Sequence, residues 1–245
     1  MTSREAILRE MGLTPIWVSR ASLGETPSAE LPAPVVAFAE SPEPAQEPPQ
    51  SAADREAAIA NFSWDELIAG IAACTACKLW KTRTNTVPGV GDRSPSWMVI
   101  GEAPGENEDK QGEPFVGKAG QLLDAMLVAV GKKRGEGVYI TNVIKCRPPG
   151  NRNPEPDEIA ACAPYLARQI ALAQPKLLLA SGKFAGQILL NCDDTVASMR
   201  ALSAVTTHRE GVPIVVTYHP SYLLRSPLEK VKSWDDLMKA KALVA

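Results

Sequence analysis

Four of the five cysteines in the chain have a spacing that suits metal ligands. Cys74 and Cys77 form a C-x-x-C pair, and Cys146 and Cys162 follow later. Such a pair can place two thiolates on one metal, but the chain lacks the second close pair of a zinc ribbon and the cysteine run of bacterial ferredoxins. The four residues predict a zinc ion or an iron–sulfur cluster, with buried free thiols as the alternative. Cys192 is expected to take no part.

A glycine- and proline-punctuated segment lies between these cysteines. It reads G-E-A-P-G-E-N-E-D-K-Q-G-E-P-F-V-G-K-A-G and covers Gly101 to Gly120. Two further motifs, N-V-I-K-C-R-P-P-G-N-R and H-P-S-Y-L-L-R, also follow apolar runs. Open α/β sheets bind their ligands at the carboxyl ends of their strands. The three motifs therefore predict one ligand site at one edge of a sheet.

The elements that would position these motifs alternate along the chain. Strands are predicted at 97–101, 138–143, 176–180 and 213–217, and helices at 64–73, 119–130, 156–173, 182–190 and 228–244. Ser63 and Glu66 form a capping box in front of the first of these helices. This alternation predicts an α/β fold in which helices cover both faces of a parallel sheet.

Composition divides the chain into three parts. The stretch 21–54 contains seven prolines, carries a net charge of −6 and has no lysine or arginine. Such a Pro/Ala/Glu-rich acidic stretch cannot bury enough apolar area to fold, so it is predicted to be a disordered linker. Residues 1–20 form a short N-terminal segment, and residues 55–245 are predicted to form the folded domain. The domain carries a net charge of +3, which permits nucleic-acid binding.

The sequence offers no sign of a membrane or an export route. No run of 18 apolar residues occurs, and the first residues mix charges of both signs. We therefore expect no membrane association and a cytoplasmic location. In a reducing compartment, an odd number of cysteines favours metal binding or catalysis over disulfides.

The motifs, in this order and with this cysteine spacing, resemble family 4 uracil-DNA glycosylases, the iron–sulfur branch of the uracil-DNA glycosylase superfamily. The resemblance covers roughly Ala72 to Arg225. It implies a three-layer α/β/α sandwich around a four-stranded parallel sheet. It also implies a [4Fe–4S] cluster on Cys74, Cys77, Cys146 and Cys162. The expected partner is uracil-containing DNA, single- or double-stranded, bound by a monomer that associates with the nucleoid.

The same resemblance assigns a uracil site to residues of all three motifs: Gly101, Ala103, Gly105, Phe115, Asn142 and His219. Phe115 would stack on the flipped base, with core packing as the alternative. The amide of Asn142 can donate to uracil O4 and accept from N3–H, although a strand-end cap is its alternative role. His219 would donate to uracil O2, where negative charge grows as the glycosidic bond breaks.

The group that positions the attacking water is less clearly marked. Ala103 occupies the place at which the best-known branch of the superfamily has an aspartate. Glu102 is the first candidate for this catalytic role and Glu108 the second. Gly105 replaces the tyrosine that excludes thymine in that branch, and Glu108 is expected to block the 5-methyl group instead.

A further set of residues near the motifs is expected to contact DNA: Lys78, Arg83, Lys145, Arg147, Arg152, Ser221, Leu223 and Arg225. Cationic side chains bind phosphates and supply affinity rather than sequence readout. Leu223 or a neighbour is expected to wedge into the base stack. The alternative is that this leucine belongs to the first turn of a helix packed on the core.

The predicted function is monofunctional excision of uracil, which leaves an abasic site for base excision repair. One rival is a non-catalytic or covalently trapping uracil-DNA-binding protein. That rival is disfavoured because V-G-K-A-G-Q follows Phe115 without an insertion or a histidine. A second rival is an electron-transfer protein. A repair or replication partner is one role open to the N-terminal extension.

Overall fold

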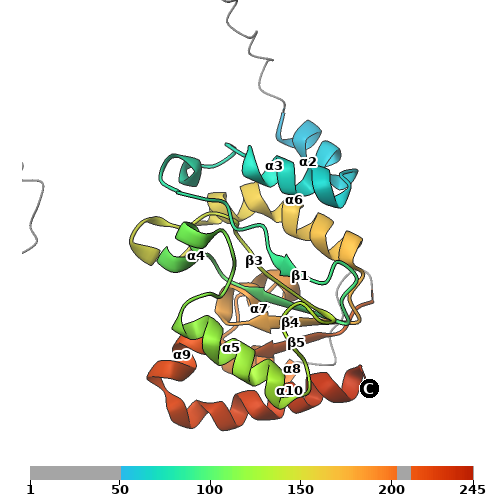
Figure 1. The fold of residues 1–245 in the computed structure, drawn as a ribbon, viewed down its shortest axis with the longest axis vertical. Coiled ribbons are helices and arrows are strands. Elements are labelled where there is room, and N and C mark those ends of the chain that lie inside the picture. Colours follow the sequence, from blue (N-terminus) through green and yellow to red (C-terminus); the bar gives the residue numbers. More distant parts are fainter. Residues whose placement is uncertain (1–50, 203–210, 245) are drawn as a thin grey trace, which may run out of the picture. The chain divides into compact units, whose positions relative to one another are not determined.

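The computed structural model describes residues 51–202 and 211–244. Figure 1 shows a central sheet with helices on both faces. The predicted segment 1–20 and most of the predicted linker lie outside the described residues. Within the described part, no helix is long and apolar enough to cross a bilayer.

The sheet has five strands in the order β1-β3-β2-β4-β5. The strands are β1 (Val90–Gly91), β2 (Trp97–Gly101), β3 (Val138–Asn142), β4 (Leu177–Ser181) and β5 (Ile214–Thr217). β1 pairs antiparallel with β3, and all other pairs are parallel. Every residue of β2 to β5 is buried, as expected for apolar runs in a sheet covered on both faces.

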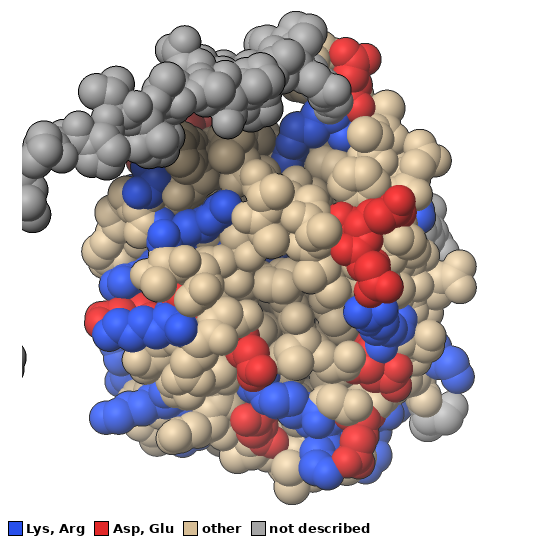
Figure 2. All heavy atoms as spheres, turned by 45° about the horizontal axis from the view of Figure 1, so that its top comes forward, with Lys and Arg blue, Asp and Glu red and all other residues tan. Residues whose placement is uncertain are grey.

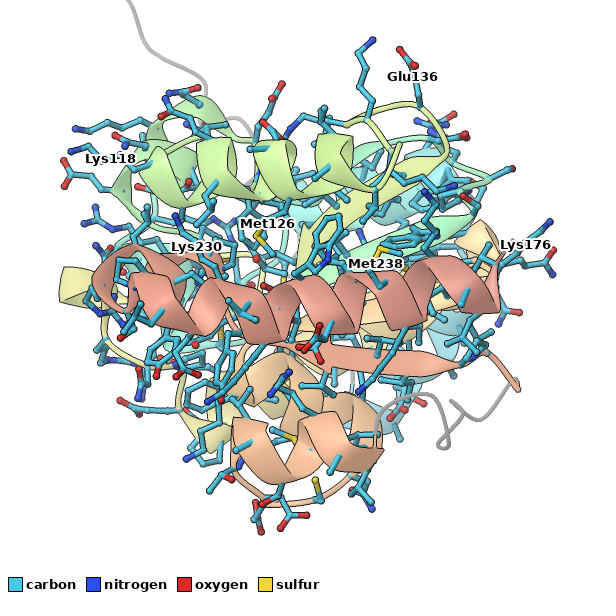
Figure 3. The ribbon with its side chains drawn as sticks, turned by 90° about the horizontal axis from the view of Figure 1, so that it is seen from below. Lys118, Met126, Glu136, Lys176, Lys230 and Met238 are labelled. Atoms are coloured by element: carbon cyan, nitrogen blue, oxygen red, sulfur yellow. The ribbon has the colours of Figure 1, made fainter. Side chains whose placement is uncertain are left out.

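The helices make up the other layers. They are α2 (Ala52–Ala60), α3 (Trp64–Ala72), α4 (Glu106–Gln111), α5 (Lys118–Ala129), α6 (Pro156–Ala173), α7 (Lys183–Leu190), α8 (Val196–Leu202), α9 (Pro220–Arg225) and α10 (Lys230–Leu243). On one face of the sheet, side chains such as Met98 and Ile100 pack against α6, α7 and α8. On the other face, Trp97 and Val99 pack against α5 and α10, which run side by side in Figure 3. The predicted three-layer sandwich is confirmed.

The strand count differs from the prediction. We expected four parallel strands, and the structure adds β1 as an antiparallel edge strand. β1 is only two residues long, and both Gly89 and Gly91 have positive φ. A strand this short carries no alternation of apolar residues that a sequence pattern could reveal. The sequence also missed the short helices α4 and α8, together with α2, and offered a helical turn at the position of α9 only as an alternative.

Helix α2 shifts the start of the folded domain. Ser51 caps it by accepting from the backbone N–H of Asp54, and its buried residue Ile59 joins a small core with Leu67 and Tyr165. The predicted boundary at Arg55 therefore falls inside a helix that packs on the domain. In Figure 1, α2 and α3 lie outside α6, away from the sheet.

Candidate functional site

A pocket of about 700 Å³ lies at the carboxyl ends of β2 to β5. Its walls come from the loops after these strands and from the start of the helices that follow. The lining includes every predicted uracil-site residue except Gly101: Ala103, Gly105, Phe115, Asn142 and His219. Glu102 and Glu108 also line it. The fold thus brings the three motifs together in one pocket, as predicted.

Strand pairing places Asn142 beside the first motif. Asn142 is the last residue of β3 and pairs with Gly101, the last residue of β2. A Cβ on Gly101 would lie 2.4 Å from Asn142 Oδ1 and 2.5 Å from Phe115 Cζ. Gly101 therefore contributes by leaving room for the amide and the ring. Asn142 itself is 2% exposed, as a group that reads a fully enclosed base would be.

Phe115 lies against His219 across the pocket. The ring centroids are 5.4 Å apart and the planes meet at 29°. Phe115 is 6% exposed and has φ of +56°, an unusual backbone conformation for a bulky side chain. The Phe115 ring thus offers a flat apolar surface in the pocket, next to the imidazole of His219.

The hydrogen bonds of His219 define which ring nitrogen can act. His219 stands at the N-cap of α9, and its Nδ1 accepts from the backbone N–H of Ser221 at 3.2 Å. Ser221 Oγ lies 2.7 Å from the same nitrogen. An Nδ1 that accepts a backbone N–H carries no proton, so the proton of the neutral ring is assigned to Nε2. The imidazole is therefore set to donate through Nε2.

Burial keeps this imidazole neutral. Desolvation, helped by the positive charge of Arg225, lowers the pKa of His219 to about 4. Above that pH the ring is neutral and can still donate a hydrogen bond. Such a donor can stabilise an oxygen on which negative charge grows.

The two candidate carboxylates have different surroundings. Glu108 Oε1 accepts from the backbone N–H groups of Val116 and Gly117 at 2.9 and 3.0 Å, and Oε2 accepts from that of Gly105 at 3.1 Å. Its carboxylate already holds two loops together, which argues against Glu108 as the second candidate for positioning the water. Glu102 lines the pocket, and burial raises its pKa. Within the described residues its carboxylate has no hydrogen-bond partner, so it is the better candidate.

The four predicted metal ligands surround a second, smaller cavity. Cys74 and Cys77 come from the loop after α3, Cys146 from the loop after β3, and Cys162 from α6. All four line this cavity, whereas Cys192 packs at the edge of the main core. Across the described residues, no set of three or more His, Cys, Asp or Glu side chains was found that could hold a metal ion.

Cationic groups surround the cysteine sulfurs. Arg83 donates to Cys146 Sγ at 3.1 Å, and Arg55 lies 3.6 Å from Cys74 Sγ. Burial raises the pKa of the Cys162 thiol to about 12, so a bound cationic group would be needed to hold it as a thiolate. Four sulfurs around one cavity fit an iron–sulfur cluster: its iron would hold them as thiolates, and the two arginine donors would offset the net negative charge of the cluster with its four thiolates. The sequence analysis did not identify Arg55 as a neighbour of the cysteines, and it predicted that Arg83 contacts DNA.

One predicted DNA contact is wrong because its charge is buried. Lys145 is 1% exposed, and its ammonium donates to Thr141 Oγ1 and to the carbonyl oxygen of Asn142. A phosphate cannot reach it there. The lysine instead ties the turn after β3 to the end of that strand.

Several of the other predicted cations are engaged in ion pairs. Lys78 pairs with Glu155, and Arg152 forms a bidentate pair with the buried Glu158. Arg147 lies 3.6 Å from Glu106. Figure 2 shows acidic side chains interspersed among basic ones on the face in view. These pairs leave less free positive charge for phosphate than the sequence had indicated.

The H-P-S-Y-L-L-R motif presents different side chains from those predicted. Leu223 is fully buried on α9, which packs against α5, so its predicted contact with DNA is wrong and the alternative of a packed helical turn holds. Leu224 is 44% exposed instead. Arg225 and Ser221 line the pocket as expected of groups near the substrate.

The pocket also has a wall that the sequence reading missed. Lys183 and Phe184, at the start of α7, line it together with Thr195 and Tyr218. Lys183 and Phe184 follow β4 directly, so the same strand-end rule could have identified them. The S-G-K-F stretch carries no recognisable motif, so the sequence did not mark it as part of the site.

Comparison with known proteins places this geometry in a family. The model of the uracil DNA glycosylase superfamily matches residues 88–238. A type-4 uracil-DNA glycosylase of Archaeoglobus fulgidus is 41% identical over 182 residues, which are 72% of this chain and 91% of the relative. One of Sulfurisphaera tokodaii is 44% identical over 71% of this chain and 81% of the relative. A type-5 uracil-DNA glycosylase of Pyrobaculum aerophilum is 31% identical over 59% of this chain and 69% of the relative.

Proposed function

The chain belongs to the uracil-DNA glycosylase superfamily, and from that membership we infer that it excises uracil from DNA by hydrolysing the N-glycosidic bond. The observation that carries this proposal is the meeting of Phe115, Asn142 and His219 in one pocket at the strand ends. The product is DNA with an abasic site, the first intermediate of base excision repair.

Excision begins with a base outside the duplex stack. Flipping costs unstacking energy, which stacking on Phe115 and hydrogen bonds in the pocket offset. The Asn142 amide can donate to uracil O4 and accept from N3–H, whereas cytosine presents the opposite pattern. An enclosed amide thus selects uracil because cytosine would leave buried polar groups unpaired.

His219 acts as the bond breaks. Negative charge grows on uracil O2, and a neutral imidazole donating through Nε2 stabilises that charge more in the transition state than in the ground state. The pKa of about 4 keeps this donor neutral at physiological pH. The Ser221 backbone N–H fixes the tautomer.

Glu102 is assigned to the water and to the positive charge that develops on the sugar. A carboxylate in the pocket can orient water without abstracting its proton fully. Glu108 is reassigned to holding the loop that carries Phe115. Arg225 and Leu224, both exposed beside the pocket, are proposed for phosphate contact and for filling the vacated stack.

The four cysteines of the second cavity are proposed to hold a [4Fe–4S] cluster. When bound, this group supplies a rigid cross-link rather than a step of the reaction. Cys74 and Cys77 would thereby be joined to Cys146, four residues after Asn142 in the chain, and to Cys162 on α6. This link would brace the loop that presents the uracil-reading amide.

We expect Cys146→Ala to remove the broad absorption near ~400 nm that a four-cysteine iron–sulfur cluster gives, because one ligand is lost. Iron content and the visible spectrum of the purified protein measure this. Cys192→Ala is the matched control and should leave both unchanged, since Cys192 does not line the cavity. Zinc, or no metal, in the wild-type protein would contradict the assignment.

The domain organisation remains a proposal in its N-terminal part. Limited proteolysis is expected to cut within residues 21–50 and to leave a fragment that starts near Ser51 and keeps glycosylase activity, because that stretch is poor in core-forming residues. Mass spectrometry of the fragment and an activity assay check this. Trimming beyond Arg55 should weaken the fragment because Arg55 contacts Cys74 and the Ala161 carbonyl. An inactive fragment starting at Ser51 would show that the extension belongs to the catalytic unit.

The proposed function is tested with an oligonucleotide that contains a single uracil. Cleavage after alkali treatment is the expected result, for single- and double-stranded substrate alike. A DNA adduct that survives denaturation would instead identify a covalently trapping binder. No product and no adduct would refute excision. An oligonucleotide with cytosine at the same position is the control and should stay intact.

A further inference from the structure

The backbone of Phe115 is held in a conformation that it would not adopt by itself. Its φ of +56° lies in the left-handed region, which is costly for a bulky side chain and persists only where the surroundings enforce it. The direction of the ring depends on this backbone, and the ring packs against both Gly101 and His219. Whatever enforces the conformation therefore controls the surface on which a base would stack.

Arg134 makes the contacts that can enforce it. Its Nη1 donates to the carbonyl oxygen of Pro114 at 3.0 Å, and its Nη2 donates to that of Phe115 at 2.8 Å. The third nitrogen, Nε, donates to Asp124 Oδ1 on α5 at 2.9 Å. A guanidinium is planar and rigid, so three simultaneous contacts fix both carbonyl groups relative to α5.

We propose that Arg134, oriented by Asp124, is a positioning residue that holds Phe115 in the conformation required to stack on a flipped uracil. The inference rests on the proposed excision of uracil. Arg134 does not line the pocket and acts only through the loop that it holds. Nothing in the three sequence motifs pointed to it, because it follows α5 by several residues.

The other contacts of the loop that carries Phe115 involve different backbone groups from those that Arg134 binds. Glu108 holds the amide groups of Val116 and Gly117, on the far side of Phe115 from Pro114. Gly120 lets α5 approach closely, since a Cβ there would lie 1.7 Å from the Phe115 oxygen. An anion thus holds the N–H groups after Phe115 and a cation holds the carbonyl groups before and at it. Without the cation, two carbonyls lose their partner and the strained φ can relax.

The expected result for Arg134→Ala is a single-turnover excision rate lowered by about 10²-fold, as for a displaced catalytic geometry. The inhibition constant of free uracil should rise with it, while half-saturation by DNA changes less than about twofold. Adding ethylguanidinium should restore part of the rate by refilling the site. The lysine of Arg134→Lys can hydrogen-bond only some of the three oxygens that Arg134 contacts. Its excision rate should therefore lie between those of the wild type and Arg134→Ala.

A double substitution separates positioning from general damage. In a Phe115→Ala background, adding Arg134→Ala should lower the rate little further, because Arg134 acts through the missing ring. Arg168→Ala is the matched control: Arg168 also donates to a carbonyl oxygen, that of Phe62, but on α6 outside the pocket. Its excision rate should remain that of the wild type.

Each outcome decides the question. A wild-type rate in Arg134→Ala, or a full additive loss in the double variant, overturns the proposal. If Arg134→Ala does not fold, Arg134→Lys and Asp124→Asn carry the same comparison, and wild-type rates in both would overturn it. If the wild-type protein itself excises no uracil, it is the proposed function that fails. The dissociation constant of free uracil, measured by direct binding to wild type and Arg134→Ala, then still reports whether Arg134 shapes the pocket.

Discussion

His219→Ala is expected to lower the single-turnover rate of uracil excision by about 10²–10³-fold, the usual cost of removing one donor from a site where negative charge develops. Binding of uracil-containing DNA should change little, because the donor is needed mainly in the transition state. Rapid-quench measurement of strand breaks after alkali treatment gives the rate, and titration with DNA gives the affinity. A near-normal rate would move the donor role to backbone amides of Gly101–Gly105.

Two comparisons test whether the donor is a neutral imidazole. His219→Gln keeps an N–H donor of similar reach and should recover part of the rate that alanine loses. Burial also raises the pKa of Glu102 in the same pocket, so the histidine is isolated by the ratio of the wild-type rate to the His219→Gln rate. This ratio should hold as pH falls below 6 and decline only near the His219 pKa of about 4. A decline of the ratio centred near pH 6.5, the ordinary histidine value, would contradict the neutral assignment.

The same shift has a consequence for stability. An unfolded histidine has a pKa of about 6.5, so between that value and about 4 the unfolded chain binds the proton more readily. The contribution of His219 to the free energy of unfolding is thus fully present above pH 6.5 and is lost as pH falls toward 4. Over this window, the stability of His219→Gln should improve relative to that of the wild type.

Asn142→Ala is expected to lower excision by about 10²-fold and also to weaken binding of uracil, because buried polar groups of the base would lose their partners. The rate and the inhibition constant of free uracil measure the two effects. Asn61→Ala is the control, since Asn61 donates only to a carbonyl oxygen in α2. An unchanged inhibition constant in Asn142→Ala would contradict the base-reading role.

Asn142→Asp extends the test to specificity. A protonated carboxyl can donate to N3 of cytosine and accept from its 4-amino group. We therefore expect this variant to release cytosine from DNA slowly, while the wild type leaves cytosine in place. The substitution would refute base reading by Asn142 if uracil remained the preferred base without any loss of rate.

The sequence by itself determined the sheet and the place of the site. The apolar runs at 97–101 and 138–143 match β2 and β3 to within a residue. Parallel strands leave their carboxyl ends at one edge, so motifs that follow different strands must meet there. For this reason the three motifs could be grouped from the sequence, and the family resemblance then singled out Phe115, Asn142 and His219 within them. The short strand β1 and the short helices α4 and α8 were missed because so few residues carry no periodic signal.

Only the tertiary structure decided which polar and apolar groups were already engaged. Glu108 and Glu102 look equivalent in sequence, yet backbone amides of a distant loop occupy Glu108. Lys145 lies beside a predicted ligand and proves to be buried, and Leu223 faces the core while Leu224 faces outward. Arg134, which follows α5 by several residues, donates to the carbonyl oxygen of Phe115. These partnerships depend on contacts between residues far apart in the chain, and no local pattern of residue types encodes them.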